Sequence, residues 1–598
     1  MSSDIGIFVA WPYANGDLHL GHIAGAYLPP DIFARYHRLR GDHVLMVSGS
    51  DSHGTPITVA AEAQGMSPRA YFEQYHRRFL ADWQRLGISF DLFTHTDTEN
   101  HAAVAQNIFR TLFEQGLIPV GTTMQLYCES DKQFLPDRYV EGTCPHCGYP
   151  KARGDQCDNC SRTLDAVDLI NPQCRLCSRS PIPREATHFF LNLPALQEQV
   201  LAYVTAQTHW RPNVQNFALH FVQDGLRPRA ISRDLNWGVP VPVPGYESKV
   251  MYVWFEAVIG YLSASIEHAR LQGNPTAWEA WWRDPNVRGY YFIGKDNIPF
   301  HTVIWPAELM GYDPTFNLPY DVPANEFLNL EGEKFSTSRN WAVWLPDYLD
   351  RYAPDPLRYY LTSVAPETGD SEFTWQGFVD HNNNELLATW GNLVNRVVSF
   401  AYTRWDGRVP TPSPLDAQDT TLLNEIATGF TTVSNLYALT KFKVALEETM
   451  TLARAVNKYL DEKAPWFQIK TDREAAATTT FVALRAIDSL SILFAPVLPF
   501  TSERVQQFLG HEQPLFGSST IDRVDEETRT HEVLRYHPLP GEGTIDRWQP
   551  STLKAGHRLE RPSALFEKLD DTLVTQERER LLQAAEASLR SEGSSSAI

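Results

Sequence analysis

The sequence predicts an α/β protein with a Rossmann-type parallel sheet that is split by an inserted domain and followed by an all-helical domain. Three observations lead to this fold class. From residue 5 to about 115, apolar runs alternate with helical stretches, as in a parallel sheet covered by helices. Residues 118–230 instead contain short alternating strands and turns rich in Cys, Gly, Pro and Asn, before the α/β pattern resumes. Long helical stretches dominate from about 375 to 540.

The expected elements follow in order along the chain. Apolar runs predict strands at "IGIFVA", "HVLMVSG" and "YYFI", with helices between them. Ligands of such sheets bind at the carboxyl ends of the strands, which is where "WPYANG", "SGSDSHGTP" and Gly294 stand. A disordered tail is expected at 591–598. The longer helices of the C-terminal half are expected at 416–440, 441–463, 473–497 and 574–590.

The composition is that of a globular protein with several domains. Hydrophobic residues make up 43% and charged residues 21% of the 598 residues, a length that corresponds to two to four domains. The net charge of −20 argues against a protein that coats nucleic acid, but it is compatible with a local basic groove. No signal peptide is visible, and Arg485 and Asp488 interrupt the apolar helix at 481–500. We therefore expect a cytoplasmic protein and no membrane partner.

The cysteines indicate metal binding. All seven lie between Cys128 and Cys177, which favours a metal site over a set of disulfides. An insertion this short buries little apolar surface, so a structural metal would supply folding free energy. Four cysteines have the C-x2-C-x9-C-x2-C spacing of a tetrahedral Zn²⁺ site with four thiolates, namely Cys144, Cys147, Cys157 and Cys160. A second site, either occupied or reduced to relic thiols, would use Cys128, Asp131, Cys174 and Cys177.

Two basic stretches could bind phosphate. His19 and His22 flank Gly21 where a strand gives way to a helix, and the N–H groups and dipole of such a helix attract phosphate. The loop "EKFSTSR" at 333–339 could close on the pyrophosphate part of ATP. Taken singly, the two histidines are equally well interpreted as ordinary surface residues, and the loop alone is better interpreted as an ordinary solvated loop. The loop would supply charge and hydrogen-bond donors from Lys334, Arg339, Ser336, Thr337 and Ser338.

Together, the two stretches resemble the paired signatures of class I aminoacyl-tRNA synthetases, and the wider sequence resembles the methionyl-tRNA synthetases. The resemblance runs from residue 5 to about 540 and rests on the ordered motifs "WPYANGDLHLGH", "GSDSHGTP", "VWFEAVIGY", "FIGKDN", "FHTVIWPA" and "DEKAPW". It implies a methionine–tRNA ligase that uses ATP with Mg²⁺ to form methionyl-adenylate and pyrophosphate. Methionine would then pass to the 2′-hydroxyl of the terminal adenosine of tRNA(Met), with initiator tRNA among the partners.

The resemblance also implies residues for each substrate. In the amino-acid site Asp51 would take the methionine ammonium, while aromatic rings enclose the side chain and Tyr261 or His301 lies near sulfur. The methionine positions are Trp11, Tyr13, Asp51, Trp254, Ala257, Val258, Tyr261, Asn297, His301 and Trp305. The ATP positions are His19, Gly21, His22, Gly294, Asp296, Lys334 and Thr337, and the catalytic ones are His19, His22, Lys334, Ser336 and Arg339.

The helical domain would bind the anticodon. Pro465 should stop or kink a helix and leave Trp466 exposed to stack on an unpaired base. The helix at 392–404 would face the anticodon with Asn395, Arg396, Ser399 and Arg404. Five positions depart from the common family pattern. Trp11 replaces Leu, Val258 replaces Pro, Ser399 replaces Asn and Phe335 replaces Met. Thr337 replaces the second lysine of the signature loop, whose charge Lys334, Arg339 or Lys295 would have to supply.

Three rival functions fit less well. Synthetases for Ile, Val or Leu carry an editing domain, for which the cysteine-rich segment leaves no room. A paralogue that binds tRNA or methionine without activating it is favoured by Thr337, but the complete set of site motifs argues against it. A ligase that donates methionine to a small molecule would not need Trp466 or the helical domain.

The expected domains can be given by residue. A monomer is expected, because the tail is too short for the further tRNA-binding domain through which some family members dimerise. The units are the first half of the catalytic domain (1–117), the zinc-knuckle insertion (118–230), the second half of the catalytic domain (231–325), the signature-loop and stem-contact region (326–375), the helical anticodon-binding domain (376–540), and a C-terminal linker, helix and disordered tail (541–598).

Overall fold

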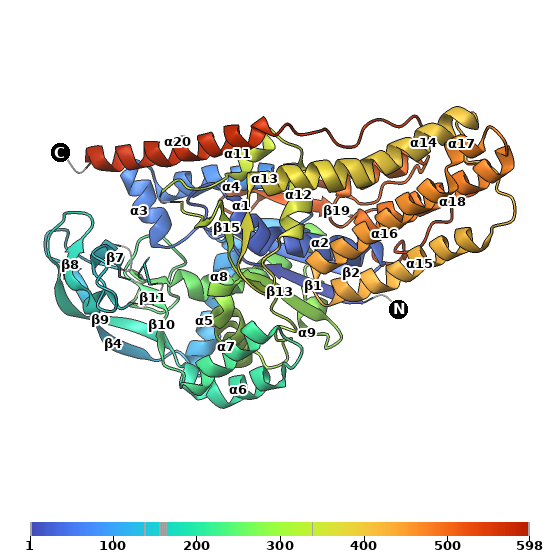
Figure 1. Cartoon of the computed structure of the whole chain (residues 1–598). Coiled ribbons are helices and arrows are strands. Elements are labelled where there is room, and N and C mark those ends of the chain that lie inside the picture. Colours follow the sequence, from blue (N-terminus) through green and yellow to red (C-terminus); the bar gives the residue numbers. More distant parts are fainter. Residues whose placement is uncertain are drawn as a thin grey trace.

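The computed structural model is built around one seven-stranded sheet (Figure 1). It describes residues 3–136, 139–154, 157, 159–160, 162, 164–337 and 339–595. The strands lie in the order β14 (Ala324–Asn325), β13 (Arg288–Gly294), β1 (Asp4–Val9), β2 (His43–Ser50), β3 (Leu92–His95), β19 (Thr530–His537) and β18 (Ser518–Asp525).

The predicted parallel sheet is confirmed for five strands, and an antiparallel hairpin that was not expected extends one edge. The strands from β14 to β3 are parallel, but the hairpin β18–β19 joins β3 in the antiparallel sense, with Leu534 opposite Phe93. This hairpin lies inside the range 376–540 that was expected to be all helical. It joins the sheet because Val533 and Leu534 are buried in the core, whereas the outer strand β18 alternates exposed and half-buried residues.

Helices cover both faces of the sheet because β1 is apolar on both. Ile7 and Val9 pack into one buried cluster, whereas Phe8, which points to the other face, packs into a second. The covering helices are α1 (Leu20–His22), η1 (Ile23–Tyr27), α2 (Leu28–Leu39), α3 (Thr55–Ala63), α4 (Pro68–Leu86), α5 (Glu99–Glu114), α8 (Val253–Leu271), α9 (Trp278–Arg283), η5 (Lys295–Asn297), η6 (Phe300–Ile304) and α10 (Trp305–Tyr312).

The described part of the insertion consists of two small sheets, two short 3-10 helices and two α-helices. One sheet contains β10 (Arg229–Ala230), β9 (Ile182–Leu191), β4 (Val120–Cys128) and β5 (Gln133–Phe134), and the other β7 (Ala152–Arg153), β6 (Val140–Thr143) and β8 (Ile170–Cys174). The helices η3 (Ala166–Asp168), η4 (Leu193–Leu196), α6 (Gln197–Ala206) and α7 (Pro212–Gln223) were not expected. Val200 and Val214, on α6 and α7, are buried in the same cluster as Phe8, so this part of the insertion packs on the central domain.

Short elements connect the sheet to the helical domain. They are β15 (Leu328–Leu330), β16 (Glu333–Lys334), α11 (Leu345–Leu349), α12 (Pro354–Ser363) and β17 (Ser371–Phe373). The short pair β11 (Ser232–Arg233) and β12 (Val250–Met251) lies instead between the insertion and α8. The helical domain contains α13 (Trp375–Asp380), η7 (His381–Gly391), α14 (Asn392–Arg404), α15 (Ala417–Ala438), α16 (Phe442–Lys463), α17 (Pro465–Gln468), α18 (Arg473–Phe494) and α19 (Pro499–Phe508).

Helix α18 is the core of the helical domain. By length and composition it could cross a membrane, but 94% of its most apolar window is buried inside the fold, as in the core helix of a bundle. After the hairpin β18–β19, the chain returns across the helical domain and ends in α20 (Thr572–Ser595). This last helix continues through 591–595, where a disordered tail was expected, and residues 596–598 lie outside the described part of the chain.

Candidate active site

The carboxyl ends of β1 and β2 bring the first motif segments together. The chain after β1 pairs with the chain after β2, because Ala14 N donates to Asp51 O at 3.1 Å and Asp51 N donates to Pro12 O at 2.8 Å. Parallel strands that end at one edge of a sheet place their following loops side by side. This pairing fixes Tyr13 next to Asp51.

His19 and His22 form a stacked pair of imidazoles. Their ring centroids lie 3.7 Å apart, and the ring of Phe335 stacks on His19 at 4.7 Å. A Cβ at Gly21 would lie 3.0 Å from the His19 ring and 3.2 Å from Phe335, so only glycine fits this approach without a shift. The structure therefore joins the first motif to the loop at 333–339, as the paired signatures predicted.

His19 and His22 differ in exposure. His19 is buried and burial, followed by the neighbouring charge of His22, holds its pKa well below the usual value, so the ring is neutral near pH 7. Its Nδ1 has no hydrogen-bond partner among the described residues. His22 is exposed to solvent. The pair therefore offers one fixed inner imidazole and one accessible outer imidazole, at a position suited to an anionic ligand.

The loop at 333–339, called the signature loop below, is held mainly by its own backbone. Ser336 and Trp341 exchange two backbone hydrogen bonds of 3.0 and 2.9 Å. Arg339 donates to Glu333 at 3.0 Å, and both side chains are 53% exposed. Lys334 is exposed, with its Nζ 5.7 Å from the Phe327 ring centroid. Thr337 is exposed, and Ser338 lies outside the described residues.

The third strand end provides open space for a nucleotide. Gly294 ends β13, and a Cβ there would meet no atom within 4 Å. Asp296 is exposed two positions further on. Lys295 is already paired, since its Nζ donates to Glu326 at 2.7 Å and to Asp370 at 3.0 Å. Of the cations near this edge, Lys295 is thus the more tightly held, whereas Lys334 and Arg339 lie at the surface.

The residues assigned to methionine by the resemblance include a set of aromatic side chains joined in part by hydrogen bonds. This set, called the amino-acid pocket below, consists of Trp11, Tyr13, Trp254, Tyr261, His301 and Trp305. His301 Nδ1 donates to Asn297 O at 2.9 Å, which leaves Nε2 to accept from the Tyr261 hydroxyl at 2.7 Å. Burial lowers the pKa of His301 to about 4, so this tautomer is neutral at pH 7. Asn297 contributes its backbone carbonyl here, while its side chain is exposed.

The tryptophans of the pocket have different surroundings. Trp254 Nε1 donates to Tyr13 Oη at 2.7 Å, and the fully buried Trp305 donates to Tyr291 Oη at 3.2 Å. Trp11 packs so closely on α8 that a Cβ at Gly260 would lie 2.7 Å from its ring. The remaining positions are the half-buried Ala257 and the buried Val258 on the same helix. The pocket has aromatic walls whose orientations are fixed before any ligand binds.

Asp51 is backed by ionic residues that the sequence analysis missed. Asp51 is 3% exposed, and burial, reinforced by the charge of Glu256, raises its pKa well above the usual value. Glu256 is fully buried and contacts His53 Nδ1 at 2.7 Å and His101 Nε2 at 2.8 Å. Burial opposes the charge on His53, but Glu256 and Asp97 raise its pKa to about 10. One indication of this buried network was visible in the sequence, where Glu256 stands inside the apolar run "VWFEAVIGY".

The anticodon candidates lie together at the far end of the helical domain. Arg396 Cζ lies 4.6 Å above the Trp466 ring, and Phe400 packs on that ring at 6.1 Å. The indole is therefore half-buried rather than exposed as predicted, because Ala464 adopts a φ of +43° and turns α17 toward α14. The neighbouring Phe467 is 67% exposed. The remaining anticodon candidates lie on α14. Asn395 and Arg404 are exposed, and the half-buried Ser399 donates from Oγ to Asn395 Oδ1 at 3.3 Å.

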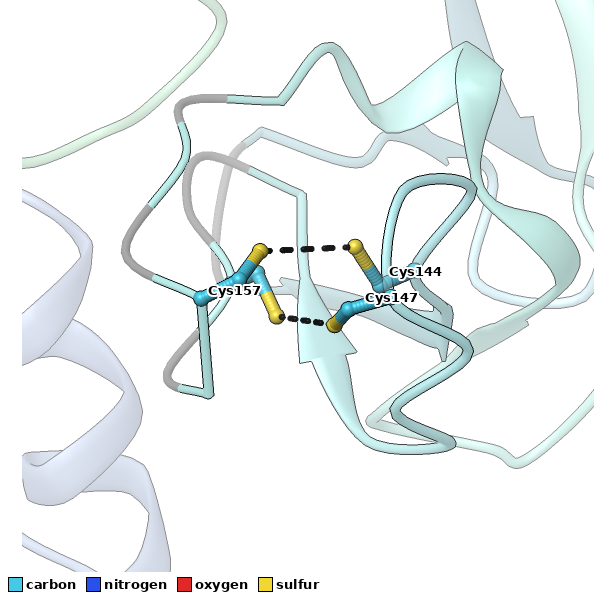
Figure 2. Close-up of side chains that lie close together, drawn as sticks. Cys144, Cys147 and Cys157 are labelled. Atoms are coloured by element: carbon cyan, nitrogen blue, oxygen red, sulfur yellow. Dashed lines mark hydrogen bonds between the residues drawn. The ribbon is translucent and has the colours of Figure 1, made fainter.

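The seven cysteines and Asp131 form two clusters of four ligands each, as predicted. Figure 2 shows the first, in which Cys144 Sγ lies 3.9 Å from Cys160 Sγ and Cys147 Sγ lies 3.6 Å from Cys157 Sγ. A tetrahedral ion about 2.3 Å from four sulfurs separates them by about 3.8 Å, so this cluster fits zinc.

The second cluster is more contracted than the first. Asp131 Oδ2 accepts from Cys128 Sγ at 3.0 Å and from Cys174 Sγ at 3.1 Å, and Cys177 Sγ lies 3.4 Å from Cys128 Sγ. A shared tetrahedral ion would hold sulfur and oxygen roughly 3.5 Å apart. The three thiols and the carboxylate are suitable zinc ligands, but the distances between them are those of hydrogen-bonded thiols and are shorter than around a bound ion.

Comparison with known proteins gives a consistent result. Residues 5–398 match the family described as tRNA synthetases class I (M), and residues 409–533 match the anticodon binding domain of methionyl tRNA ligase. The chain is 67% identical to the methionine–tRNA ligase of Thermomicrobium roseum, covering 97% of this chain and 99% of that one. It is 51% identical to that of Chloroflexus aurantiacus, with 98% and 100% covered.

A solved structure shares the fold over nearly the whole chain. Mycobacterium tuberculosis methionyl-tRNA synthetase in complex with methionyl-adenylate superposes with a TM-score of 0.74 at 25% identity, covering 95% of this chain and 100% of that one. The family matches, the overall likeness and the joined signature motifs agree with one another. The chain therefore belongs to the methionyl-tRNA synthetases, a family of class I aminoacyl-tRNA synthetases.

Proposed function

We propose that this chain, a methionine–tRNA ligase, binds methionine in the amino-acid pocket and the phosphates of ATP between the His19–His22 pair and the signature loop. The observation that carries the proposal is the stacking of Phe335 on His19, whose ring centroids are 4.7 Å apart. Two segments separated by more than 300 residues thereby form one wall of a site. That wall lies next to the carboxyl edge of the sheet, where nucleotides bind in such folds.

The first chemical step needs positioning more than proton transfer. The methionine carboxylate is ionised at neutral pH and attacks the α-phosphorus of ATP in line, so that the α–β bridging bond breaks and pyrophosphate leaves with its Mg²⁺. His22 and the neutral His19 would donate hydrogen bonds to the phosphates, and Ser336 and Thr337 would add hydroxyl donors. Gly294 and Asp296 would accommodate adenosine and its ribose.

Arg339 is the cation best placed to supply the charge of the lysine that other family members have at the position of Thr337. Its ion pair with Glu333 is exposed, and such pairs contribute only about 0–1 kcal/mol. Little free energy is therefore lost when the guanidinium turns toward a phosphate. Lys295 would have to leave two carboxylates, Glu326 and Asp370, to do the same.

The amino-acid pocket accounts for selection of methionine. Asp51 would take the ammonium group, and ligand binding would favour its ionised form in spite of its burial. The Tyr261–His301 pair would lie near the sulfur, since a thioether is a weak acceptor best placed among aromatic rings and few donors. The 2′-hydroxyl of the terminal adenosine of tRNA(Met) would then attack the methionyl carbonyl of the adenylate. The ester to tRNA forms as the bond to phosphate breaks, and AMP leaves.

The test is methionine-dependent ATP–pyrophosphate exchange, with leucine and isoleucine as control amino acids. We expect exchange with methionine alone, and a further rise of up to about tenfold in Thr337→Lys, because an added cation stabilises the transferring phosphates. If the parent chain shows no exchange and Thr337→Lys restores it, the chain would be a tRNA-binding paralogue and the catalytic roles proposed for it would be wrong.

We also propose that Cys144, Cys147, Cys157 and Cys160 hold a structural zinc ion. Their spacing supports it, and zinc would add folding free energy to a small core around Leu126, Tyr139 and Val140. The Cys128, Asp131, Cys174 and Cys177 set would hold a second ion once its thiols lose their protons. Metal analysis of the purified protein should give two zinc ions per chain, and Asp131→Ala should give one. One zinc ion per chain in both proteins would mean that the second set no longer binds metal and that its cysteines are relics of a lost site.

The remaining features of the proposal concern the partners and state of the protein. Trp466, Arg396 and Asn395 would recognise the anticodon of both elongator and initiator tRNA(Met), and the enzyme would act as a cytoplasmic monomer. Aminoacylation of each tRNA measured separately, and light scattering at several protein concentrations, test these points. Charging of only one tRNA, or a mass that rises with concentration to that of a dimer, would contradict them.

A further inference from the structure

The C-terminal helix α20 is docked on the catalytic side of the molecule. Figure 1 shows it as the red helix running over α11 and α13. Val574 and Leu581 on α20 are each only 5% exposed. Glu577 is 3% exposed and accepts hydrogen bonds from Arg351 at 3.0 Å and from Tyr352 at 2.7 Å, just after α11. The helix is therefore anchored by buried contacts, which sets the position of its remaining side chains.

Two further contacts of α20 fall on the two ends of the signature loop. At the start of the loop, Arg578 donates to Glu331 Oε2 from Nε at 2.9 Å and pairs through Nη2 at 2.8 Å. At its end, Asn340 Nδ2 donates to Ala584 O at 3.4 Å. Glu331 and Asn340 both have positive φ angles, +48° and +50°, so each is a sharp bend that flanks the loop.

One rigid element thus spans the loop. Positions 578 and 584 lie about 9 Å apart along a helix axis. Glu331 is also held from the other side, because its Oε1 accepts from Trp375 N at 2.8 Å. Asn340 continues the connection, since its Oδ1 accepts from Trp344 Nε1 at 2.9 Å and the backbone of Trp344 pairs with that of His19. Contacts from α20 therefore reach both hinges of the loop and, through Trp344, the histidine pair.

We propose that α20 is a brace for the signature loop and that Arg578 is a positioning residue for the ATP reaction. This inference rests on the proposed role of the loop in binding phosphates. Within the loop, β16 pairs with β15 and Phe335 stacks on His19, but Lys334 and Arg339 are exposed and Arg339 makes a surface ion pair, so the contacts from α20 add support at the two bends that flank the loop. Preorganised donors are effective only when their support is fixed, and a displacement of about 1 Å lowers the rate severalfold or more.

The experiment compares three substitutions on α20 by pyrophosphate exchange. Arg578→Ala should lower kcat about fivefold to tenfold and leave the KM for methionine within twofold, because the described contacts of Arg578 are with Glu331 beside the loop and not with the amino-acid pocket. Arg578→Lys should restore at least half of the lost rate. Arg590→Ala is the matched control, since Arg590 pairs with Glu586 on the same helix, and it should behave like the parent chain. Glu331→Gln, which removes the charge at the loop but keeps the acceptor for Trp375, should reproduce the effect of Arg578→Ala.

Hydrogen exchange provides a readout that separates positioning from general stability. In Arg578→Ala the peptide covering 331–341 should exchange faster, while peptides from α16 and α18 should be unchanged. If Lys334→Ala leaves pyrophosphate exchange unaltered, the proposed function of the loop is wrong. If Lys334→Ala slows it but Arg578→Ala and Glu331→Gln match Arg590→Ala, the loop acts without the brace and the present inference is wrong.

Discussion

The amino-acid pocket and the signature loop, which we propose form one active site, are built in opposite ways. In the pocket, Tyr261, His301 and Trp305 are buried and their polar atoms are paired with one another or with neighbours. In the loop, Lys334 and Arg339 are exposed, and the ion pair of Arg339 with Glu333 lies at the surface. The buried polar groups of the pocket are thus already paired, whereas the charged groups of the loop are at the surface and free to turn toward a ligand.

This difference indicates how binding and catalysis are divided. Rejection of a wrong amino acid requires a pocket whose buried polar groups would be left unpaired by the wrong ligand, which a fixed site achieves best. Stabilisation of moving charge on phosphates requires donors that can close after ATP has entered. Substitutions in the pocket should therefore change KM for methionine, and substitutions in or beside the loop should change kcat.

The largest effect is expected for His22→Ala. Removal of an imidazole donor from the phosphate side should lower kcat for pyrophosphate exchange about 100-fold, while the KM for methionine stays within twofold. His43→Ala is a suitable control, because His43 is exposed and pairs with Asp4 away from the site. A loss of less than threefold in His22→Ala, or a rise in the KM for methionine of similar size, would remove the contrast between the two regions.

A smaller effect of the opposite kind is expected for Tyr261→Phe. The substitution removes the hydroxyl that donates to His301 Nε2 and leaves a buried acceptor unpaired, at a cost of about 1–3 kcal/mol. The KM for methionine should rise roughly tenfold or more, with little change in the KM for ATP. Tyr203→Phe, which removes a hydroxyl bonded to Pro319 O, is the matched control. An equal rise in both KM values would show that the pocket and the nucleotide site are not separate.

A third effect concerns the lysine that Thr337 replaces. If Arg339 supplies the missing charge, Arg339→Ala should lower exchange about threefold to fivefold in the parent chain and have less effect in Thr337→Lys, where a lysine already neutralises the phosphates. The double-mutant cycle in kcat measures this coupling. Strictly additive losses would assign the compensating charge to another residue.

The sequence predicted the fold well wherever the signal was local. Strands such as 43–50 and helices such as α16 and α18 follow from apolar periodicity, which is a property of neighbouring residues. The hairpin β18–β19 was missed because its place beside β3 depends on a contact between Leu534 and Phe93, more than 400 residues apart. Its alternating pattern could have been recognised as a pair of strands, but not as an edge of the central sheet.

The site shows the same limit. The resemblance assigned His19, Tyr261 and His301 to one site, and the structure places Phe335 of the signature loop on His19 and joins Tyr261 to His301 by a hydrogen bond. The network of Glu256 with His53 and His101 joins three separate segments, so no spacing rule could have found it. The partial burial of Trp466 depends on the left-handed conformation of Ala464, a residue type that rarely adopts it.

The smallest effect is expected from Glu308, a buried carboxyl on α10 that belongs to neither region. Burial raises its pKa well above the usual value, and both oxygens have no hydrogen-bond partner among the described residues. The folded state therefore keeps a proton that the unfolded state loses above its pKa of about 4.3, so Glu308 makes stability fall as pH rises above that value. Glu308→Gln should remove this dependence and raise the unfolding temperature by about 2–4 °C at pH 8, with a smaller gain at pH 5.

Thermal unfolding at both pH values, with pyrophosphate exchange at 25 °C, checks this prediction. Glu279→Gln, on an exposed position of α9, is the control for loss of a carboxylate and should change neither quantity. A stability gain in Glu308→Gln that is equal at pH 5 and pH 8 would mean that packing rather than ionisation limits the site. Because α10 carries Trp305 of the amino-acid pocket, any accompanying change in activity should appear in the KM for methionine and leave the loop-dependent kcat unaltered.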